Sequence, residues 1–492
     1  MAAATFADLP LHADVQRALA RMRFRAPSPV QLRALPLALF GSDVVAQAKS
    51  GTGKTGVFAA AAVERVVGAP EALAAQVAPL ALLLAPTREV AAQIAAVVQQ
   101  VAHFRPDVAE NLRRGCHIAI GTPGRVKALV EQRALRCHAL RLLVLDEVDK
   151  LLQSDFESEL HFIVAALPER RQTLAFSATF TTEQLAAVVR MMRSPQIVRV
   201  RGPQDTTVEL VSTREELATW TQREAAGGHP ELWLRHVKQF YSVVTRAASS
   251  SSGGGGSGSD ASAALDMGAK VAKLASLLAE VVFSQCMVFC NDKLRAEALA
   301  TALAAQGWPA VCITGAQPQA ARSEAMAGFR AFRSRVLVST DLTARGIDVD
   351  RVNFVVNLDL PRDPATYLHR VGRAGRFGGR GLAVTLLAAE DVGAVEMLAR
   401  VFGMSIAELP TPVPRAVSEF VRETTATRSE DVGSAAEALP RREPAEEQQA
   451  ARDGPTQNAS PRVVAAGASS PEQLISTLAW EEACYERWLT LL

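Results

Sequence analysis

The feature that most constrains the fold is a repeated alternation of short apolar runs with helix-like stretches rich in alanine, leucine and glutamate. This alternation predicts parallel α/β sheets, because parallel neighbours need a crossover, usually a helix, between them. The pattern occurs twice along the chain, so two tandem α/β domains with parallel sheets are expected. The predicted strands are Asp43–Gln47, Ala81–Ala85, His117–Gly121, Leu142–Asp146 and Thr173–Ser177, followed by Cys286–Cys290, Val311–Thr314, Val336–Ser339 and Phe354–Asn357.

A change from regular apolar patterning to polar sequence between the two halves defines the predicted domain boundaries. The 492 residues are too many for one core. Domain one is predicted at residues 1–200 and domain two at residues 235–415, with a polar linker at residues 201–234. Domain two is expected to begin with a strand at Val237–Val244 and to carry a flexible Ser/Gly-rich insertion at residues 246–268.

The C-terminal segment has a different composition. Residues 416–470 are rich in Glu, Arg, Ala, Ser and Pro with few aromatics, which predicts a disordered tail. Residues 471–492 are predicted to form a short helix, because two serines precede a proline suited to the first turn. Its apolar stripe would dock either on a protein partner or back on domain two, and consists of Leu474, Leu478, Tyr485, Trp488 and Leu492.

Charge and cysteine usage limit the class of protein. Lys plus Arg number 53 against 51 Asp plus Glu, so any nucleic-acid site has to be a local groove. The six cysteines form no CxxC pair, and Cys286 and Cys290 fall on one face of a predicted strand, which favours core packing. We expect reduced thiols, no membrane partner, and an intracellular protein of the cytoplasm, the nucleus or both. No secretory leader is visible, and the longest apolar stretch is about half the ~20 residues of a membrane span.

The segment AKSGTGKT, residues 48–55, follows a predicted strand and opens a predicted helix, as a phosphate-binding P-loop does. Its glycines let backbone N–H groups turn towards the phosphates, Lys54 reaches the β and γ oxygens, and Thr55 ligates Mg²⁺. We therefore predict ATP and Mg²⁺ as cofactors. The predicted nucleotide-binding residues of this loop are Ser50, Gly51, Thr52, Gly53, Lys54 and Thr55.

Two further elements suit phosphoryl transfer. The apolar strand of LLVLDEVD ends at Asp146 and Glu147, which we assign to the metal and to general-base catalysis. The run HRVGRAGR, residues 369–376, supplies arginines from the other half of the chain. Arginines that meet the γ-phosphate would make hydrolysis depend on domain closure.

These motifs, in this order, resemble the DEAD-box RNA helicases of superfamily 2 over residues 6–415. The resemblance implies two RecA-like domains and an RNA-dependent ATPase. RAPSPVQ resembles the Q motif, so that Gln31 would read the adenine edge and Phe24 would stack on the ring. Asp348 would contact the ribose, and Arg373 and Arg376 would be the arginine fingers. The resemblance further implies a group that couples hydrolysis to strand separation, namely Asp149, Ser177, Thr179 and His369.

The same resemblance identifies an RNA site made mostly of backbone contacts, which predicts weak sequence specificity. APTREVAAQ and GTPGR of domain one resemble RNA-backbone motifs. GAQPQAAR and STDLTARGID of domain two look like two more. The predicted contacts to a single RNA strand are Pro86, Thr87, Arg88, Thr122, Gly124, Arg125, Gln319, Arg322, Thr340 and Arg345.

The chain departs from the family pattern in two places. Arg23 occupies the glycine position of the Q motif, at a turn. Only the 22 residues 94–115 separate Gln93 from Cys116, where the family has a further strand and a Gly-Gly turn that helps to grip RNA. Either this chain lacks that strand or a coding segment has been lost from the sequence.

The resulting prediction is an ATP-dependent RNA helicase that performs local strand separation or ribonucleoprotein remodelling. Stretches such as LDEVDKLLQSDFESEL and KQFYSVV look closest to helicases of the survival-of-motor-neuron complex, which would imply small nuclear ribonucleoprotein assembly. Two alternatives stay open: an RNA clamp or scaffold with weak ATPase activity, and a DNA helicase.

Overall fold

The computed structural model describes residues 5–421, with gaps at residues 25, 50, 71–77, 106–116, 154–155, 201–205, 211–233, 235, 245–258, 345–346, 348, 350, 362, 376–378 and 403. Residues 422–492 lie outside the described part, and with them most of the predicted tail and the predicted docking helix.

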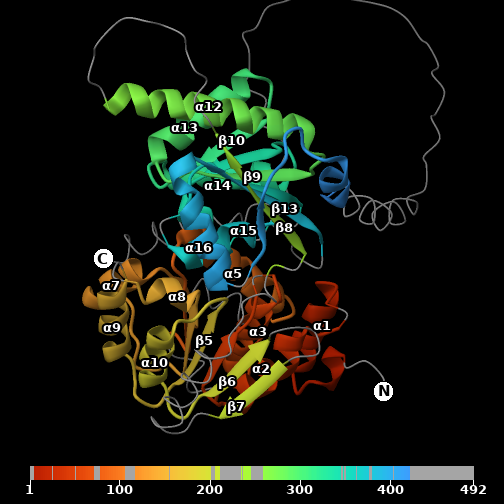
Figure 1. Cartoon of the computed structure of the whole chain (residues 1–492). Coiled ribbons are helices and arrows are strands. Elements are labelled where there is room, and N and C mark those ends of the chain that lie inside the picture. Colours follow the sequence, from red (N-terminus) through yellow and green to blue (C-terminus); the bar gives the residue numbers. More distant parts are fainter. Residues whose placement is uncertain are drawn as a thin grey trace, which may run out of the picture. The chain divides into compact units, whose positions relative to one another are not determined.

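Domain one is a seven-stranded sheet in the order β3-β2-β4-β5-β1-β6-β7. All neighbouring strands are parallel except β6 and β7. The strands are β1 (Val44–Gln47), β2 (Ala81–Leu84), β3 (Ile118–Gly121), β4 (Leu142–Asp146), β5 (Gln172–Ser177), β6 (Gln196–Val200) and β7 (Thr206–Leu210). The helices that Figure 1 labels around it include α1 (Ala13–Arg21), α2 (Pro29–Phe40), α3 (Lys54–Val67), α5 (Arg88–Val101), α7 (Pro123–Glu131), α8 (Val148–Leu151), α9 (Glu157–Ala166) and α10 (Thr182–Arg190).

Domain two repeats the plan with a seven-stranded, all-parallel sheet in the order β10-β11-β9-β12-β13-β8-β14. Its strands are β8 (Val237–Val243), β9 (Gln285–Phe289), β10 (Ala310–Ile313), β11 (Val336–Ser339), β12 (Val352–Asn357), β13 (Gly381–Leu387) and β14 (Ile406–Glu408). Its helices include α12 (Ser259–Glu280), α13 (Lys293–Ala305), α14 (Gln319–Arg330), α15 (Pro364–Val371) and α16 (Val392–Phe402) (Figure 1).

Burial of both sheet faces explains the uninterrupted apolar runs. Along β4, Leu142 and Val144 pack into one cluster, whereas Leu143 and Leu145 pack into another on the opposite face. Parallel strands covered by helices on both sides need apolar residues at every position. The predicted α/β class with two parallel sheets is therefore confirmed, and each predicted strand matches an observed one within one or two residues at its ends.

Several predicted boundaries are wrong. The linker assigned to residues 201–234 contains β7, which completes the domain-one sheet by pairing antiparallel with β6. Helix α12 begins at Ser259, inside the predicted Ser/Gly insertion. Residues 415–421, mostly assigned to the tail, are helical, and Val417 and Val421 are buried in the domain-two core. Domain two therefore extends past the predicted limit, because apolar side chains there cover its sheet.

Other expectations concern the cysteines, the membrane and the shortened segment. Cys286 and Cys290 are fully buried in one cluster, as predicted. Among the described residues, no helix combines the length and apolarity needed to cross a bilayer. The segment between α5 and β3, where a further strand was in question, includes residues 106–116, which lie outside the described residues.

Candidate functional site

The predicted nucleotide site lies at one edge of the domain-one sheet. The strands β4, β5 and β1 are adjacent and parallel. Their carboxyl ends lead into Asp146, Ser177 and the loop before α3. Because parallel strands present their carboxyl ends at the same edge, the fold brings together groups that are far apart in sequence, and this edge is where such sheets bind ligands.

The loop between β1 and α3 has the backbone of a phosphate cradle. Gly51 and Gly53 adopt φ values of 78° and 91°, a region that strains other residues. Gly53 caps α3, so N–H groups at the start of this helix are available to an anion. The side chain of Lys54 is buried, and its Nζ donates to the carbonyl of Ala48 at 2.7 Å. Ser50 lies outside the described residues.

The Q-motif residues pack against this loop. The Gln31 amide donates from Nε2 to the Gly53 carbonyl at 3.2 Å and accepts from the Ser28 backbone N–H at 2.8 Å. A Cβ atom on Gly53 would come within 2.6 Å of Nε2 of Gln31 and would displace this amide, and the φ of 91° at Gly53 independently favours glycine. Phe24 meets Phe6 edge-on, with ring centroids 5.9 Å apart. The contacts of Gln31 and Phe24 with adenine stay predictions.

Arg23, at the family's glycine position, has a φ of 61°, which is left-handed backbone. The usual glycine therefore has a physical reason, and arginine is tolerated there at a conformational cost of roughly 1–2 kcal/mol.

The Asp146 and Glu147 carboxyls are both buried, and the Glu147 N–H donates to Oδ1 of Asp146 at 3.0 Å. Burial raises the pKa of Asp146 to about 7, the negative charge of Glu147 adds to the rise, and Lys54 opposes it. Glu147 has a φ of 50°, so strained backbone holds this pair. A buried carboxyl that is costly to ionise in the ligand-free protein suits a site completed by a cation.

We expect Asp146→Asn to stabilise the ligand-free protein more at high pH than at low pH. Between the ordinary aspartate pKa of 3.8 and about 7, the folded state holds a proton that the unfolded state has released, so stability falls as pH rises through this window. Urea unfolding without Mg²⁺ measures the gain over the parent chain, which should be larger at pH 8 than at pH 5 by ~2–3 kcal/mol. The exposed Asp391→Asn is the control, and an equal gain at both pH values would contradict the prediction.

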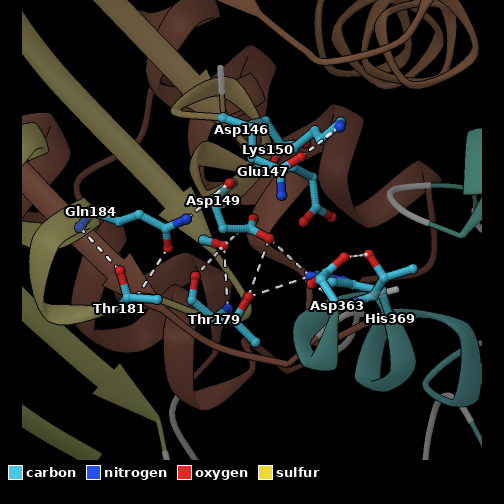
Figure 2. A network of polar contacts seen from close by, with 12 residues as sticks. Asp146, Glu147, Asp149, Lys150, Thr179, Thr181, Gln184, Asp363 and His369 are labelled. Carbon is cyan, nitrogen blue, oxygen red and sulfur yellow. Dashed lines mark hydrogen bonds and ion pairs between the residues drawn. The ribbon is translucent and has the colours of Figure 1, made fainter. Parts of the chain in front are cut away.

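The four predicted coupling residues meet in one network, in which Figure 2 labels Asp149, Thr179 and His369. Asp149 accepts from Oγ of Ser177 at 2.6 Å and from Oγ1 of Thr179 at 3.2 Å. Its Oδ2 lies 3.0 Å from Nε2 of His369, which is also 3.3 Å from Oγ1 of Thr179. His369 comes from α15 of domain two, so the network ties the second domain to the carboxylates of the first.

The ligand-type atoms of Glu147, Asp149 and His369 also lie within 4.8 Å of one another. Both oxygens of Asp149 already accept hydrogen bonds, so this trio serves as an interdomain polar contact. The metal assignment to Thr55 and Asp146 stays a prediction.

The arginine run divides into different roles. Arg370 is fully buried and is structural: it bonds Asp341 at 2.5 Å, the Asn291 side chain at 2.6 Å and the Asp359 carbonyl at 2.9 Å. Arg373 is also buried, and its Nη1 donates to the Ile347 carbonyl at 2.6 Å. Arg376, Asp348 and Arg345 lie outside the described residues, so their predicted roles stay predictions.

The domain-one residues predicted to bind RNA lie side by side. Pro86, Thr87 and Arg88 follow β2, and Thr122, Gly124 and Arg125 follow β3, its parallel neighbour. The side chains of Arg88 and Arg125 are exposed, as a contact to RNA phosphates requires. Thr87 also caps α5 by accepting from the Val90 N–H at 3.3 Å.

In domain two the structure assigns some predicted RNA residues another partner. Thr340 follows β11 and is half-buried. Nη1 of Arg322 lies 3.1 Å from Oε1 of Glu89, and Nε2 of Gln319 lies 3.3 Å from the same atom. Arg322 and Glu89 are both less than a tenth exposed. Gln319 and Arg322 therefore hold the two domains together, and their contact with RNA stays a prediction.

Two residues of the site were not predicted from the sequence. Glu89 neighbours a predicted RNA contact, and no local signal identifies it as the partner of domain two. Gln184 donates to the Asp149 carbonyl at 3.1 Å. Thr181 and Gln184 form a capping box, a sequence signature of a helix start. That signature locates the helix start, although only the tertiary fold brings it to Asp149.

Known proteins match most of the chain. A DEAD/DEAH box helicase model matches residues 28–188, and a helicase conserved C-terminal domain model matches residues 269–378. "Probable ATP-dependent RNA helicase DDX20" of Mus musculus is 38% identical over 85% of this chain and 47% of its own length. "ATP-dependent RNA helicase eIF4A" of Saccharomyces cerevisiae is 34% identical over 83% of this chain and 93% of its own. The chain thus spans about half the length of the mouse relative.

Solved structures agree with this match. Dbp5 of S. cerevisiae, bound to RNA and ADP BeF3, superimposes with a TM-score of 0.69 at 27% identity, over 85% of this chain and 99% of that one. Mss116, bound to single-stranded RNA and UDP-BeF, superimposes with a TM-score of 0.67 over 88% of this chain and 86% of that one. At 21% identity the second supports the fold alone.

Proposed function

Because this chain belongs to the DEAD-box family of ATP-dependent RNA helicases, we propose that it separates RNA strands locally by ATP-driven closure of its two RecA-like domains. The observation that carries this proposal is the contact of His369 with Asp149 and Thr179. It connects domain two to the residue two positions after Glu147, so closure and the chemistry of hydrolysis share one network.

The donor set fits a nucleoside triphosphate with Mg²⁺. Gly51 and Gly53 supply a backbone cradle, Lys54 a buried ammonium, and Asp146 a buried carboxylate. The hydroxyl of Thr55, next to Lys54 at the start of α3, is a ligand of the type Mg²⁺ prefers. We propose that Thr55 and Asp146 hold this ion, directly or through its water shell. When bound, it would neutralise phosphate charge and orient the γ-phosphate.

Each residue of the site has a defined task in this mechanism. Lys54 orients and neutralises the β and γ phosphates, and Glu147 accepts the proton of the attacking water. Arg373 and Arg376 stabilise the charge that spreads over the transferred phosphoryl group. Loss of phosphate weakens the closed arrangement, so the contacts of His369 and Arg322 with domain one break and the RNA leaves.

RNA would be gripped through its backbone. The exposed Arg88 and Arg125 and the half-buried Thr340 follow strands at the carboxyl edges of the two sheets. We propose that these residues contact phosphates and sugars of one strand, so that binding depends strongly on salt and weakly on sequence. Closure bends the bound strand, and a paired partner dissociates.

An RNA-stimulated ATPase assay tests the proposal. We expect ATP turnover by the whole chain to rise at least ~10-fold with single-stranded RNA and much less with DNA of the same sequence, because the 2′-hydroxyl distinguishes the two. Tight RNA binding with turnover unchanged would favour the clamp or scaffold instead. Equal stimulation by DNA would favour a DNA helicase.

We also propose a cellular process, a partner-binding segment and a location for this protein. We propose a role in ribonucleoprotein assembly, supported by the stretches LDEVDKLLQSDFESEL and KQFYSVV, which look closest to helicases of the survival-of-motor-neuron complex. The Trp- and Tyr-containing segment at residues 471–492 would dock a protein partner, since such side chains dominate interface hot spots. A pull-down with and without this segment tests that role. We propose an intracellular location, where ATP and RNA occur together.

A further inference from the structure

A second concave site lies in domain one, away from the nucleotide. It is a cavity of about 550 Å³ between the start of β1 and the loops that precede β4, β5 and β6. Its charged lining consists of five arginines and one carboxylate: Arg65, Arg141, Arg170, Arg171, Arg193 and Asp43. No role in ATP or RNA binding was assigned to any of them.

Topology places this cavity at the opposite edge of the sheet from the nucleotide site. Asp43 immediately precedes β1, and Arg141, Arg171 and Arg193 come within three residues before β4, β5 and β6. The P-loop, Asp146 and Ser177 stand at the other ends of the same strands. Strands of four to six residues separate the two edges by roughly 13–20 Å. The cavity therefore cannot be an extension of the ATP site.

Buried polar contacts hold the cavity in shape. Asp43 accepts from the Thr173 N–H and the Arg193 N–H, both at 2.7 Å. Gln172 donates to the Ser42 carbonyl at 2.7 Å and accepts from Nη2 of Arg65 at 2.5 Å. These contacts join the loop before β1, the start of β5, the loop before β6 and helix α3 into one preorganised wall, which lowers the ordering cost of binding a ligand.

The charge of the cavity is unbalanced. The lining holds five guanidinium groups and a single carboxylate, whose oxygens already accept backbone hydrogen bonds. Three of these guanidinium groups donate to uncharged oxygens, namely the Gln172 side chain, the Pro168 carbonyl and the Arg171 carbonyl. Burial lowers the pKa of Arg65 and of Arg171, and the positive charge of Arg193 adds to the effect on Arg171. Among the described residues, Nε of Arg65 and Nε of Arg171 are buried and have no hydrogen-bond acceptor. In a chain with a net charge of only +2, this local concentration of positive charge favours the binding of an anion.

The depth of the arginines indicates the kind of anion. Arg141, Arg170 and Arg193 are exposed at the rim, whereas Arg65 and Arg171 are half-buried. A terminal phosphate group can pass the rim and reach the inner pair. An internal phosphodiester of RNA carries a sugar on either side and is therefore bulkier than a terminal phosphate. Planar guanidiniums suit bidentate contacts with such terminal phosphates.

We propose that this five-arginine cavity binds a compact polyphosphate anion with terminal phosphate groups, at a site distinct from the P-loop. Inorganic tripolyphosphate is a suitable probe, titrated calorimetrically into the full chain saturated with ADP so that the P-loop is occupied. The double variant Arg170→Gln/Arg193→Gln should weaken its binding at least ~10-fold, since a charge-assisted hydrogen bond corresponds to about that change in affinity. Both substitutions lie at exposed positions and spare the backbone contacts of Asp43.

The matched control is Arg400→Gln/Arg415→Gln, which removes the same charge from exposed positions of domain two and should leave the affinity within about twofold. Equal weakening by both variants would mean a general charge effect and would overturn the proposal, as would no binding by the parent chain. A loss of single-stranded RNA affinity in the Arg170/Arg193 variant, with tripolyphosphate binding unchanged, would assign the cavity to RNA instead. RNA-stimulated ATPase activity should persist in this variant, so a failure here is distinguishable from a failure of the helicase proposal.

Discussion

We expect Lys54→Ala to lower RNA-stimulated ATP turnover by at least ~10³-fold, because two effects act together. The phosphates lose a buried ammonium that orients them. The Asp146 carboxyl also loses the positive charge that opposes the rise of its pKa, so it holds its proton to higher pH and becomes a poorer metal ligand. A steady-state phosphate-release assay with saturating RNA measures the loss.

Lys293→Ala is the control for this experiment, since it removes the same charge at an exposed helix start in domain two. Its turnover should match that of the parent chain. Nucleotide binding by Lys54→Ala, followed with a fluorescent ATP analogue, should weaken in parallel with turnover. Normal turnover in this variant would show that the loop before α3 is not the ATP site.

Most of the strands that are buried at every position were predicted, although β13, with the largely apolar sequence GLAVTLL, was not. LLVLD and QTLAFS are buried at every position and largely apolar, because helices cover both faces of β4 and β5. Strand β6 was not predicted because QIVRV carries an arginine and lies towards the edge of the sheet. Strand β7 was assigned to a linker because TTVEL is largely polar, and it pairs only with β6. Such strands depend on a neighbour that local sequence cannot identify.

The residues of the candidate site likewise fall into those that local sequence predicts and those that depend on tertiary contacts. The P-loop was predictable because its glycines answer a local need for positive φ, which Gly51 and Gly53 show. The contact of Asp149 with His369 was expected only from the family resemblance, since the distance between these two residues depends on how the two domains meet. Arg370 and Arg373 look alike in sequence, yet Arg370 is fixed by the Asp341 side chain whereas Arg373 bonds the Ile347 carbonyl. Only tertiary contacts distinguish these two arginines, since both side chains are buried in domain two.

Substitution of Arg373 tests its predicted role as an arginine finger. If Arg373 acts as an arginine finger, Arg373→Ala should lower RNA-stimulated turnover by at least ~10³-fold, because the transition state loses a positive charge close to the γ-phosphate. ATP affinity in the absence of RNA should change only a few-fold, since binding to the first domain does not require the finger. Single-turnover hydrolysis with bound RNA separates the chemical step from nucleotide binding.

Because Arg373 is buried, a purely structural role must also be tested. In that role the side chain only supports domain two through its hydrogen bonds to the Ile347 and His369 carbonyls. Arg373→Lys keeps the charge but loses the planar fork, so a finger role predicts a partial recovery of turnover. A supporting role predicts instead a fall in melting temperature for both variants, in proportion to the loss of turnover. Arg351→Ala, at an exposed position of the same domain, is the control for charge. Near-normal turnover in a destabilised Arg373→Ala chain would assign Arg373 to the domain scaffold and leave Arg376 as the finger to be tested.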